Sequence, residues 1–222
     1  MAYRHDIFVS YKWGGDLKVW VDSVFIPILK NVLIELKDEF RDTDIFHDVR
    51  STLSGANVPD VLRDGVAYSK CMVCVVNKPY FTNSKWCTEE LSAMLRREEE
   101  TGVRRNADHV GLVFPVLFVD EAETELGNQN TVYTHRGAAG LLEQILPLKL
   151  NEEKFFCIAA GFKGTTGYDQ LRLTIKRWVR NGLLKQIQTP PEWRPGWGEL
   201  PYFESRFNPP ALVQEHFAMP QL

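Results

Sequence analysis

The chain has 222 residues, of which 44% are hydrophobic and 25% charged, and its formal net charge is −3. This composition is typical of one soluble globular domain whose core is large enough to be stable without disulfides. The small net charge gives no electrostatic reason to expect nucleic acid or an anionic membrane as a partner.

The four cysteines, at positions 71, 74, 87 and 157, are too few in a chain of this length to form a disulfide framework. The opening residues, MAYRHDIFVSYKW, lack a basic stretch followed by an apolar one, so we expect no signal peptide. No apolar run approaches the roughly 18 residues that a transmembrane helix needs. We therefore expect a reduced, cytoplasmic protein.

Apolar runs and helical patterns alternate along the chain. We expect strands at Asp6–Tyr11, Thr43–Asp48, Cys71–Asn77, Gly111–Asp120 and Lys154–Ala160. We expect helices at Asp16–Phe40 (kinked at Pro27), Val58–Ser69, Asn83–Thr101 and Tyr168–Ile187. Short, uniformly apolar strands that alternate with helices predict a parallel sheet covered by helices on both faces. Ligands of such folds bind beyond the carboxyl ends of the strands, so the loops after Tyr11, Asp48 and Asn77 are candidates.

The last 34 residues have a different composition. Residues 189–222 contain seven of the twelve prolines and six aromatic residues, which is unlike a plain flexible linker. We therefore divide the chain into a domain at 1–188 and a tail at 189–222. The tail either straps across its own domain or docks another protein or domain.

Several short patterns do not predict a site. Cys71 and Cys74 have CxxC spacing, but in a strand residues i and i+3 point to opposite faces, so we expect two buried thiols and no metal site. The glycine-rich stretch Gly161–Gly167 lacks the order of a phosphate-binding loop. The chain contains neither a GxGxxG nor a Gly-x-Ser-x-Gly sequence, so a Rossmann cofactor site and a hydrolase elbow are both unsupported.

Three segments resemble the Toll/interleukin-1 receptor (TIR) domain family. They are YRHDIFVSYK, the long stretch from IFHDVRSTLSG through CMVCVVN to SKWCTEEL, and VFPVLFVD, and they occur in the family's order between residues 3 and 187. The resemblance implies an α/β fold with a flavodoxin-like five-stranded parallel sheet. Some members of the family are scaffolds that self-associate, and others, including bacterial defence effectors, cleave NAD+ at the nicotinamide–ribose bond. In the catalytic members the active glutamate occupies the position of Glu90.

Helical geometry distinguishes the adjacent glutamates 89 and 90. At about 100° per residue, Cys87, Leu91 and Met94 fall on the side that faces the sheet, together with Glu98 at an end expected to fray. Glu90 lies at the edge of this side, one turn from Trp86, whereas Glu89 is expected in solvent. The helix N-terminus is expected to keep Glu90 ionised, which suits a group that stabilises an oxocarbenium-like state.

The resemblance implies further site residues. Ser10, Tyr11 and Lys12 end the first strand and line the nucleotide pocket, where Lys12 contacts a phosphate or the ribose. Asp48 borders the pocket, Arg50 meets a phosphate, and Gly55 belongs to the loop at Asp48–Asn57 through which such domains self-associate. With Trp86 and catalytic Glu90, these residues make the predicted site. NAD+ is the substrate, no cofactor is expected, and the chain is weakly active until it assembles.

The leading hypothesis is therefore an NAD+ nucleosidase, hydrolysing or cyclising its product, that acts as an immune, antiviral or cell-death effector. A sensor or activator is expected to act through the C-terminal segment. The alternative is a non-catalytic TIR scaffold that signals through homotypic contacts, for which the loop and the tail matter more than Glu90. A third hypothesis is a nucleoside-transferring enzyme of similar architecture.

Overall fold

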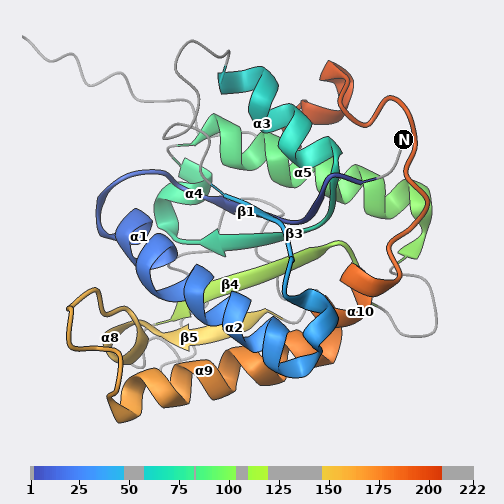
Figure 1. Cartoon of the computed structure of the whole chain (residues 1–222). Coiled ribbons are helices and arrows are strands. Elements are labelled where there is room, and N and C mark those ends of the chain that lie inside the picture. Colours follow the sequence, from blue (N-terminus) through green and yellow to red (C-terminus); the bar gives the residue numbers. More distant parts are fainter. Residues whose placement is uncertain (1–2, 48–57, 83, 104–109, 120–146, 207–222) are drawn as a thin grey trace, which may run out of the picture.

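The computed structural model describes residues 3–47, 58–82, 84–103, 110–119 and 147–206 (Figure 1). Its centre is a five-stranded sheet made of β1 (His5–Tyr11), β2 (Ile45–Phe46), β3 (Ser69–Val76), β4 (Val113–Val119) and β5 (Leu148–Asn151). All neighbouring strands pair in parallel, and their order is β2-β1-β3-β4-β5. This is the flavodoxin-like order, so the predicted fold class is confirmed.

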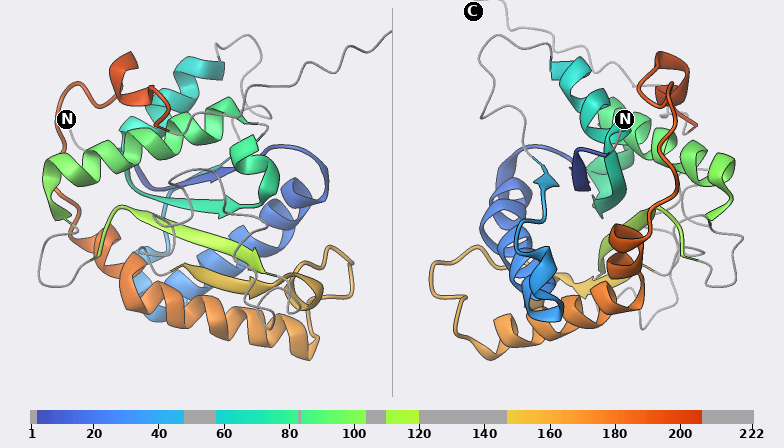
Figure 2. Two further views of the ribbon diagram at one scale, coloured as in Figure 1. Left: turned by 180° about the vertical axis from the view of Figure 1, so that it is seen from behind. Right: turned by 45° about the vertical axis from the view of Figure 1, so that its right-hand side comes forward.

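Helices cover both faces of the sheet (Figures 1 and 2). One face packs against α1 (Gly15–Trp20), α2 (Ile26–Leu36) and α9 (Thr166–Trp178), and the other against α3 (Val58–Ala67), α4 (Lys78–Thr82) and α5 (Lys85–Thr101). Side chains alternate between the two cores, as strand geometry requires. Cys71 belongs to the first core and Cys74 to the second, which confirms the prediction that the CxxC pair points to opposite faces. Both thiols are free, and burial raises their pKa.

The predicted helix at Asp16–Phe40 is divided in the structure. A π-helical turn, Val21–Phe25, separates α1 from α2, and a short 3₁₀ turn follows at Asp38–Phe40. Pro27 lies in the first turn of α2, where its missing N–H is tolerated. The helical hydrogen-bond pattern therefore changes one turn before Pro27, which accommodates the proline without ending the helix.

The predicted fifth strand at Lys154–Ala160 is wrong. The strand is β5, Leu148–Asn151, and the chain then forms the short helix α8 (Glu152–Phe155). In β5 the side chains of Leu148 and Leu150 are buried, whereas Lys149 between them is exposed. This one-sided alternation fits an edge strand and lacks the continuous apolar run that the prediction required.

The aromatic residues of the Lys154–Ala160 run fill the core beside α1. The indole N–H of Trp20 donates to the carbonyl oxygen of Phe155 at 2.8 Å. The ring of Phe156 lies 5.3 Å from that of Phe118 on β4 and 6.1 Å from that of Trp20. Phe155 and Phe156 are therefore apolar because they pack on a helix and a strand, not because they belong to the sheet, whereas Ile158 in the same run is exposed.

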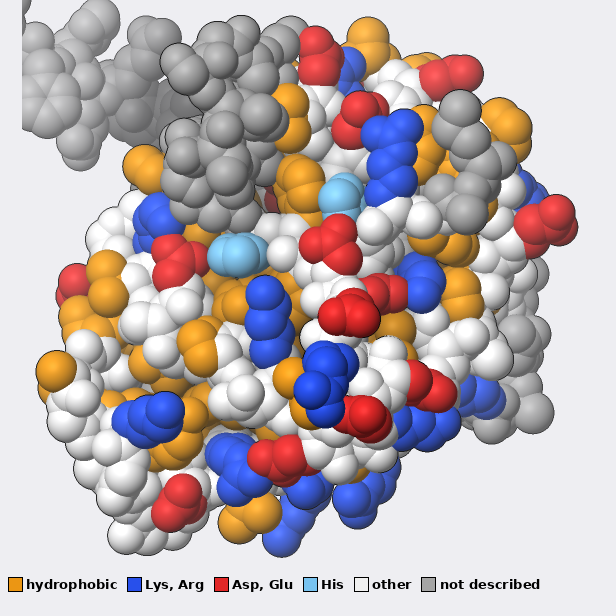
Figure 3. All heavy atoms as spheres, viewed as in Figure 1, with side chains coloured by type: hydrophobic (Ala, Val, Ile, Leu, Met, Phe, Trp, Pro, Cys, Tyr) orange, Lys and Arg blue, Asp and Glu red, His pale blue; other side chains and the backbone are white. Residues whose placement is uncertain are grey.

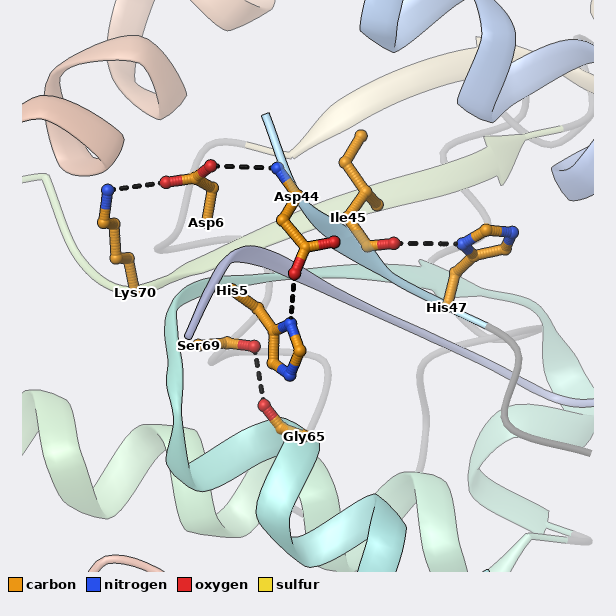
Figure 4. Close-up of polar contacts among 8 residues, drawn as sticks. All are labelled: His5, Asp6, Asp44, Ile45, His47, Gly65, Ser69 and Lys70. Atoms are coloured by element: carbon orange, nitrogen blue, oxygen red, sulfur yellow. Dashed lines mark hydrogen bonds and ion pairs between the residues drawn. The ribbon is translucent and has the colours of Figure 1, made fainter. Parts of the chain in front are cut away.

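The second strand is shorter than the predicted Thr43–Asp48 and pairs only through Ile45 and Phe46. Polar contacts fix its start against β1 and β3 (Figure 4). His5 Nδ1 lies 2.5 Å from Asp44 Oδ2, and the amide of Asp44 donates to Asp6 Oδ2 at 3.0 Å. Lys70 Nζ donates to the other oxygen of Asp6 at 2.5 Å. These contacts hold the start of β2 against the neighbouring strand β1.

The end of α5 is not frayed, contrary to the prediction for Glu98. This residue is buried, and its Oε1 accepts hydrogen bonds from the amides of Leu112 and Val113 at 2.5 and 2.8 Å. Gly102, with φ of 65°, ends the helix in the left-handed conformation that glycine adopts without strain. Glu98 therefore connects the end of α5 to the start of β4.

The final helix of the domain was predicted at Tyr168–Ile187. The structure has α9, a π-helical turn at Val179–Leu183 and α10 (Leu184–Gln188), with Thr165 as the N-cap of α9. The predicted apolar face is confirmed, because Leu171, Ile175 and Val179 are all fully buried in the first core. This helical segment and α2 form the outer layer of that face.

Residues 189–206, here called the C-terminal strap, run back across α3 and α5 (Figure 2). Its described contacts join it to Tyr3 near the N-terminus, to the end of α3 and to the second core. The hydroxyl of Tyr3 donates to the Pro191 carbonyl at 2.7 Å, and the indole of Trp193 donates to the Ala67 carbonyl at 3.1 Å. Phe203, in the 3₁₀ turn Leu200–Phe203, enters the second core. For these residues the tail lies on its own domain, and positions 207–222 lie outside the described residues.

Charges of both signs intermingle on the face seen in Figure 3. Several are paired within the chain, as where Lys176 Nζ lies 3.1 Å from Glu35 Oε2 and Arg172 contacts the same carboxylate. In the part of the chain that the structure describes, no helix combines the length and the apolar character needed to cross a bilayer.

Candidate active site

The candidate site begins at the N-terminus of α5. Ser84 is the N-cap, and its hydroxyl oxygen accepts a hydrogen bond from the amide of Cys87 at 3.3 Å. The helix then runs without interruption to Thr101, close to the predicted range of Asn83–Thr101. Leu91 and Met94 of this helix are buried in the second core, and this apolar face decides which of the glutamates at 89 and 90 faces the sheet.

Glu90 faces the sheet and contacts the end of β1. It is only 5% exposed, and the hydroxyl of Ser10 donates to its Oε2 at 2.6 Å. Ser10 lies on the same face of β1 as Phe8, the face that α5 covers, because strand side chains alternate. The prediction placed Glu90 at a rim between core and cleft, but the structure places it deeper, among buried side chains at the carboxyl end of β1.

A second hydroxyl, which the sequence did not predict, completes this cluster. Tyr80 on α4 is fully buried, and its phenol oxygen lies 2.8 Å from Ser10 Oγ. The helix α4 follows directly after β3, so Tyr80 reaches the same edge of the sheet as Ser10. A signal was available in the sequence, because Tyr80 closely follows Asn77, after which the sequence predicts a candidate ligand-binding loop.

Burial governs the protonation of Glu90. Desolvation and, to a smaller extent, the charge of Glu89 together raise the pKa of its carboxyl to about 8, against the opposing effect of the Ser10 hydrogen bond. The expectation that the helix N-terminus keeps Glu90 ionised is therefore wrong at neutral pH. Glu90 is the sixth residue of α5, past the first turn to which the helix dipole is largely confined. Desolvation outweighs what remains of that dipole.

Glu89 is less exposed than predicted. Its side chain is 15% exposed and its Oε1 lies 3.5 Å from Nζ of Lys85, one helical turn earlier. The side chain of Lys85 is 80% exposed, so this ion pair lies at the surface. The two adjacent glutamates therefore differ as predicted in direction, one inward and one outward, but the outward one is partly covered.

The other predicted site residues are not all brought together. Tyr11 is buried in the opposite core, with α1 and α2, so it faces away from Glu90. Lys12 follows the end of β1, is partly exposed, and lies near enough to Cys87 for its charge to affect the pKa of that thiol. Trp86, 36% exposed, lies one helical turn before Glu90. Asp48, Arg50 and Gly55 lie outside the described residues.

This arrangement has a definite chemical capability. A buried carboxyl that is hydrogen-bonded to a hydroxyl ionises more readily when a positive charge is placed beside it. The resulting carboxylate interacts strongly with that charge, because the surroundings are buried. Among the described residues no group of three or more His, Cys, Asp or Glu side chains could hold a metal ion. The burial of Glu90 and its hydrogen bond to Ser10 make this carboxyl suited to electrostatic stabilisation of a positive charge.

Comparison with known proteins identifies the family of the chain. No curated protein matches the chain. Among solved structures, the TIR domains in the structure of the activated Roq1 resistosome directly recognizing the pathogen effector XopQ share 20% sequence identity with it. That match covers 83% of this chain and 95% of the other, with a TM-score of 0.38. The family model described as "TIR domain" matches residues 7–146, more than half of the sequence. The chain belongs to the TIR domain family.

Proposed function

We propose that this TIR domain is an NAD+ nucleosidase, a glycohydrolase or cyclase, in which Glu90 is the catalytic residue. The observation that carries the proposal is the position of Glu90, buried at the carboxyl edge of the sheet with its Oε2 bound by Ser10. Ligands of open α/β sheets bind at this edge. A carboxylate held there by a hydrogen bond can act on a bound nucleotide without reorganising.

The reaction matches the chemistry of a single carboxylate. The bond between ribose C1′ and the pyridinium nitrogen breaks, and its electron pair goes to that nitrogen, so nicotinamide leaves as a neutral molecule. The positive charge moves to C1′ and the ring oxygen, as in glycoside cleavage. Water then attacks C1′ and loses a proton to give ADP-ribose, or an adenine nitrogen of the same molecule attacks to give a cyclic product. No general acid is needed for the leaving group.

The raised pKa of Glu90 fits a cationic substrate. In the empty site burial favours the neutral acid, since the pKa is about 8. A pyridinium ring placed beside the carboxyl supplies an opposite charge, which favours the ionised form. The site is therefore suited to a cation and to the oxocarbenium-like state that follows from it, because both interact with Glu90 in its anionic form.

The remaining predicted residues have supporting roles in this proposal. Lys12, at the end of β1, contacts a phosphate or the ribose, and the exposed ring of Trp86 covers the substrate at the mouth of the site. The loop at Asp48–Asn57, with Arg50 and Gly55, completes the site and mediates self-association. Assembly raises the activity, and an activator acts through the C-terminal segment. In the cell, loss of NAD+ or formation of a nucleotide signal makes the protein an immune or cell-death effector.

The test compares two isosteric substitutions at adjacent positions. NAD+ consumption and its products are followed by chromatography at high protein concentration, with and without a crowding agent. We expect Glu90→Gln to abolish NAD+ loss and Glu89→Gln to retain most of it, because only Glu90 contacts Ser10. If the native chain consumes NAD+ no faster than Glu90→Gln under every condition, the enzymatic proposal fails and the non-catalytic scaffold takes its place. Offering nucleosides instead of NAD+ tests the transferase alternative.

A further inference from the structure

Three hydroxyl and carboxyl groups from three different elements form one continuous chain of hydrogen bonds. Tyr80 on α4 lies 2.8 Å from Ser10 on β1, and Ser10 lies 2.6 Å from Glu90 on α5. Ser10 and Glu90 are separated by 80 positions in the sequence, and Ser10 and Tyr80 by 70. All three are buried, so this is a polar network inside the second core, where such a network has to be fully satisfied to be stable.

The direction of the chain follows from the number of protons. A serine hydroxyl has one proton to donate, and ionised Glu90 can only accept. In this ionised state of Glu90, which the proposed reaction uses, Ser10 donates its proton to Oε2, and its oxygen must accept from the phenol of Tyr80. Burial raises the pKa of Tyr80 well above its usual range, so the phenol keeps its proton and remains a donor. Because Tyr80 donates to the oxygen of Ser10, the proton of Ser10 is directed toward Glu90.

The other charged and titratable groups nearby do not provide this contact. Cys87, on α5, lies near both Glu90 and the hydroxyl of Ser10, but burial raises the pKa of its thiol, so it stays neutral and is a weaker acceptor for the Ser10 proton than the carboxylate. Cys74, on β3, is likewise a buried neutral thiol close to Tyr80. Glu89, on the same helix, raises the pKa of Glu90 through like-charge repulsion. Lys12, after β1, lowers the pKa of Cys87 through its positive charge. Among the described residues, Ser10 is the one that donates a hydrogen bond to the carboxylate of Glu90.

We propose that Tyr80 is a positioning residue for Glu90 that acts through Ser10. Its phenol donates to Ser10, so the Ser10 proton is directed to Oε2 and holds the ionised carboxylate in one orientation. This series of hydrogen bonds ends at the fully buried phenol of Tyr80, so it positions the carboxylate and does not carry protons to solvent. The catalytic consequence rests on the proposed function, whereas the coupling of Tyr80 to Glu90 does not.

The coupling is tested by the ionisation of Glu90 itself, in protein with ¹³C-labelled glutamate carboxyls and with the Glu90 signal assigned by Glu90→Gln. Loss of a hydrogen bond to the charged form raises a carboxyl pKa. We expect Ser10→Ala to raise the pKa of Glu90 by about one unit, and Tyr80→Phe by a few tenths through loss of cooperativity. Tyr80→Phe keeps the ring that packs against Phe81, so the fold is retained.

The decisive comparison is the double variant. If Tyr80 acts through Ser10, then Tyr80→Phe changes nothing further once Ser10→Ala is present, but it still raises the pKa in a Ser10→Thr background, where the hydroxyl is kept. Tyr168→Phe, which removes a phenol from α9 on the other face of the sheet, is the matched control and is expected to leave the pKa unchanged. An equal shift in the presence and absence of the Ser10 hydroxyl, or no shift from Tyr80→Phe, overturns the proposal.

An activity measurement separates this proposal from the proposed function. With NAD+ as substrate, we expect Tyr80→Phe to lower kcat about threefold to tenfold with little change in KM, since orientation of the carboxylate matters most in the transition state. If the native chain has no NAD+ nucleosidase activity, the proposed function fails, but the carboxyl titration still supports or overturns the coupling. If activity is present and the titration shows no coupling, only the positioning role fails.

Discussion

The guanidinium of Arg97 on α5 lies 4.1 Å from the centre of the Trp197 ring in the C-terminal strap. Both side chains are fully buried. Arg97 donates to the carbonyl oxygens of Val66 and Ser69 at 2.7 and 2.9 Å, and burial lowers its pKa to about 10. Two carbonyls, the Trp197 ring and Tyr3 therefore surround this cation, with the charge of Glu100 nearby, and the strap excludes water from it.

The strap should consequently contribute to the stability of the domain. We expect Trp197→Ala to lower the free energy of unfolding by about 3–5 kcal/mol, because it removes a buried ring and exposes a buried cation. Leu200→Ala in the same segment, 66% exposed, is the control and should change it by less than about 0.5 kcal/mol. The urea concentration at the midpoint of unfolding is measured for the native domain and both variants. Equal midpoints for Trp197→Ala and the native domain would show that the strap does not stabilise the domain.

The activity should depend on pH through Glu90. If the ionised carboxylate is the active form, kcat/KM for NAD+ rises as the pH increases through about 8, the pKa of the free site. The apparent pKa of kcat should be lower, because the bound pyridinium favours the anion. Initial rates from about pH 6 to pH 9, corrected for uncatalysed NAD+ breakdown, measure both. A rate that falls across this range would mean that neutral Glu90 is the active form.

Glu90 should also make the domain less stable at alkaline pH. Its pKa is raised in the folded state from 4.5 to about 8, so between these values folded Glu90 retains a proton that the unfolded chain releases. The stability of the native domain must then fall as the pH rises through this range. Glu90→Gln removes this dependence, and between pH 5 and pH 8 it should gain up to about 4 kcal/mol relative to the native chain.

A matched variant separates this effect from other titrations. Glu89→Gln changes the neighbouring glutamate, whose side chain is partly exposed and paired with Lys85, and it should keep the pH dependence of the native domain. Urea unfolding at several pH values gives the free energy of unfolding as a function of pH for the native domain, Glu90→Gln and Glu89→Gln. Parallel curves for all three proteins would mean that Glu90 ionises normally in the folded state.

Gly65 on α3 is predicted to tolerate no side chain. A Cβ atom there would lie 2.5 Å from Cε1 of Phe46, whose ring packs between His5 and Phe8 with centroid separations of 4.9 and 5.5 Å. Gly65→Ala should therefore destabilise the domain by about 1–3 kcal/mol, although alanine is the better helix former.

Two further variants test this explanation. Gly161→Ala places its methyl group in open space and should be neutral. Combining Gly65→Ala with Phe46→Leu should cost less than the sum of the single changes, because the smaller side chain relieves the contact. Strict additivity in thermal or urea unfolding would show that the ring of Phe46 moves aside freely.

Much of the fold could be predicted from the pattern of apolar residues, because parallel strands buried on both faces leave a strong signal. The run Cys71–Asn77 became β3 almost unchanged. The fifth strand was wrong because periodicity does not distinguish an apolar strand from aromatic residues such as Phe155 and Phe156, which pack on α1. The edge strand Leu148–Asn151 has only two buried apolar side chains and gave a weak signal.

The candidate site was predicted less completely. Helical periodicity separated Glu90 from Glu89, and the alternation along β1 is enough to place Ser10 on the side of α5. Tyr80 was missed because its role depends on where the short helix α4 turns after β3, which no periodicity determines. The ionisation state of Glu90 was predicted wrongly because it depends on burial, a property of the assembled core and not of the position in the helix.

A carboxyl that is neutral in an empty site and ionised beside a cation links binding to proton release. Near pH 7, a positively charged ligand beside Glu90 would expel close to one proton, since the pKa of the empty site is about 8. Its affinity would then rise with increasing pH, by up to about tenfold for each pH unit, until the pH reaches about 8. The measured heat of binding would also vary with the ionisation enthalpy of the buffer, so calorimetry in two buffers could detect the charge of the ligand without any turnover.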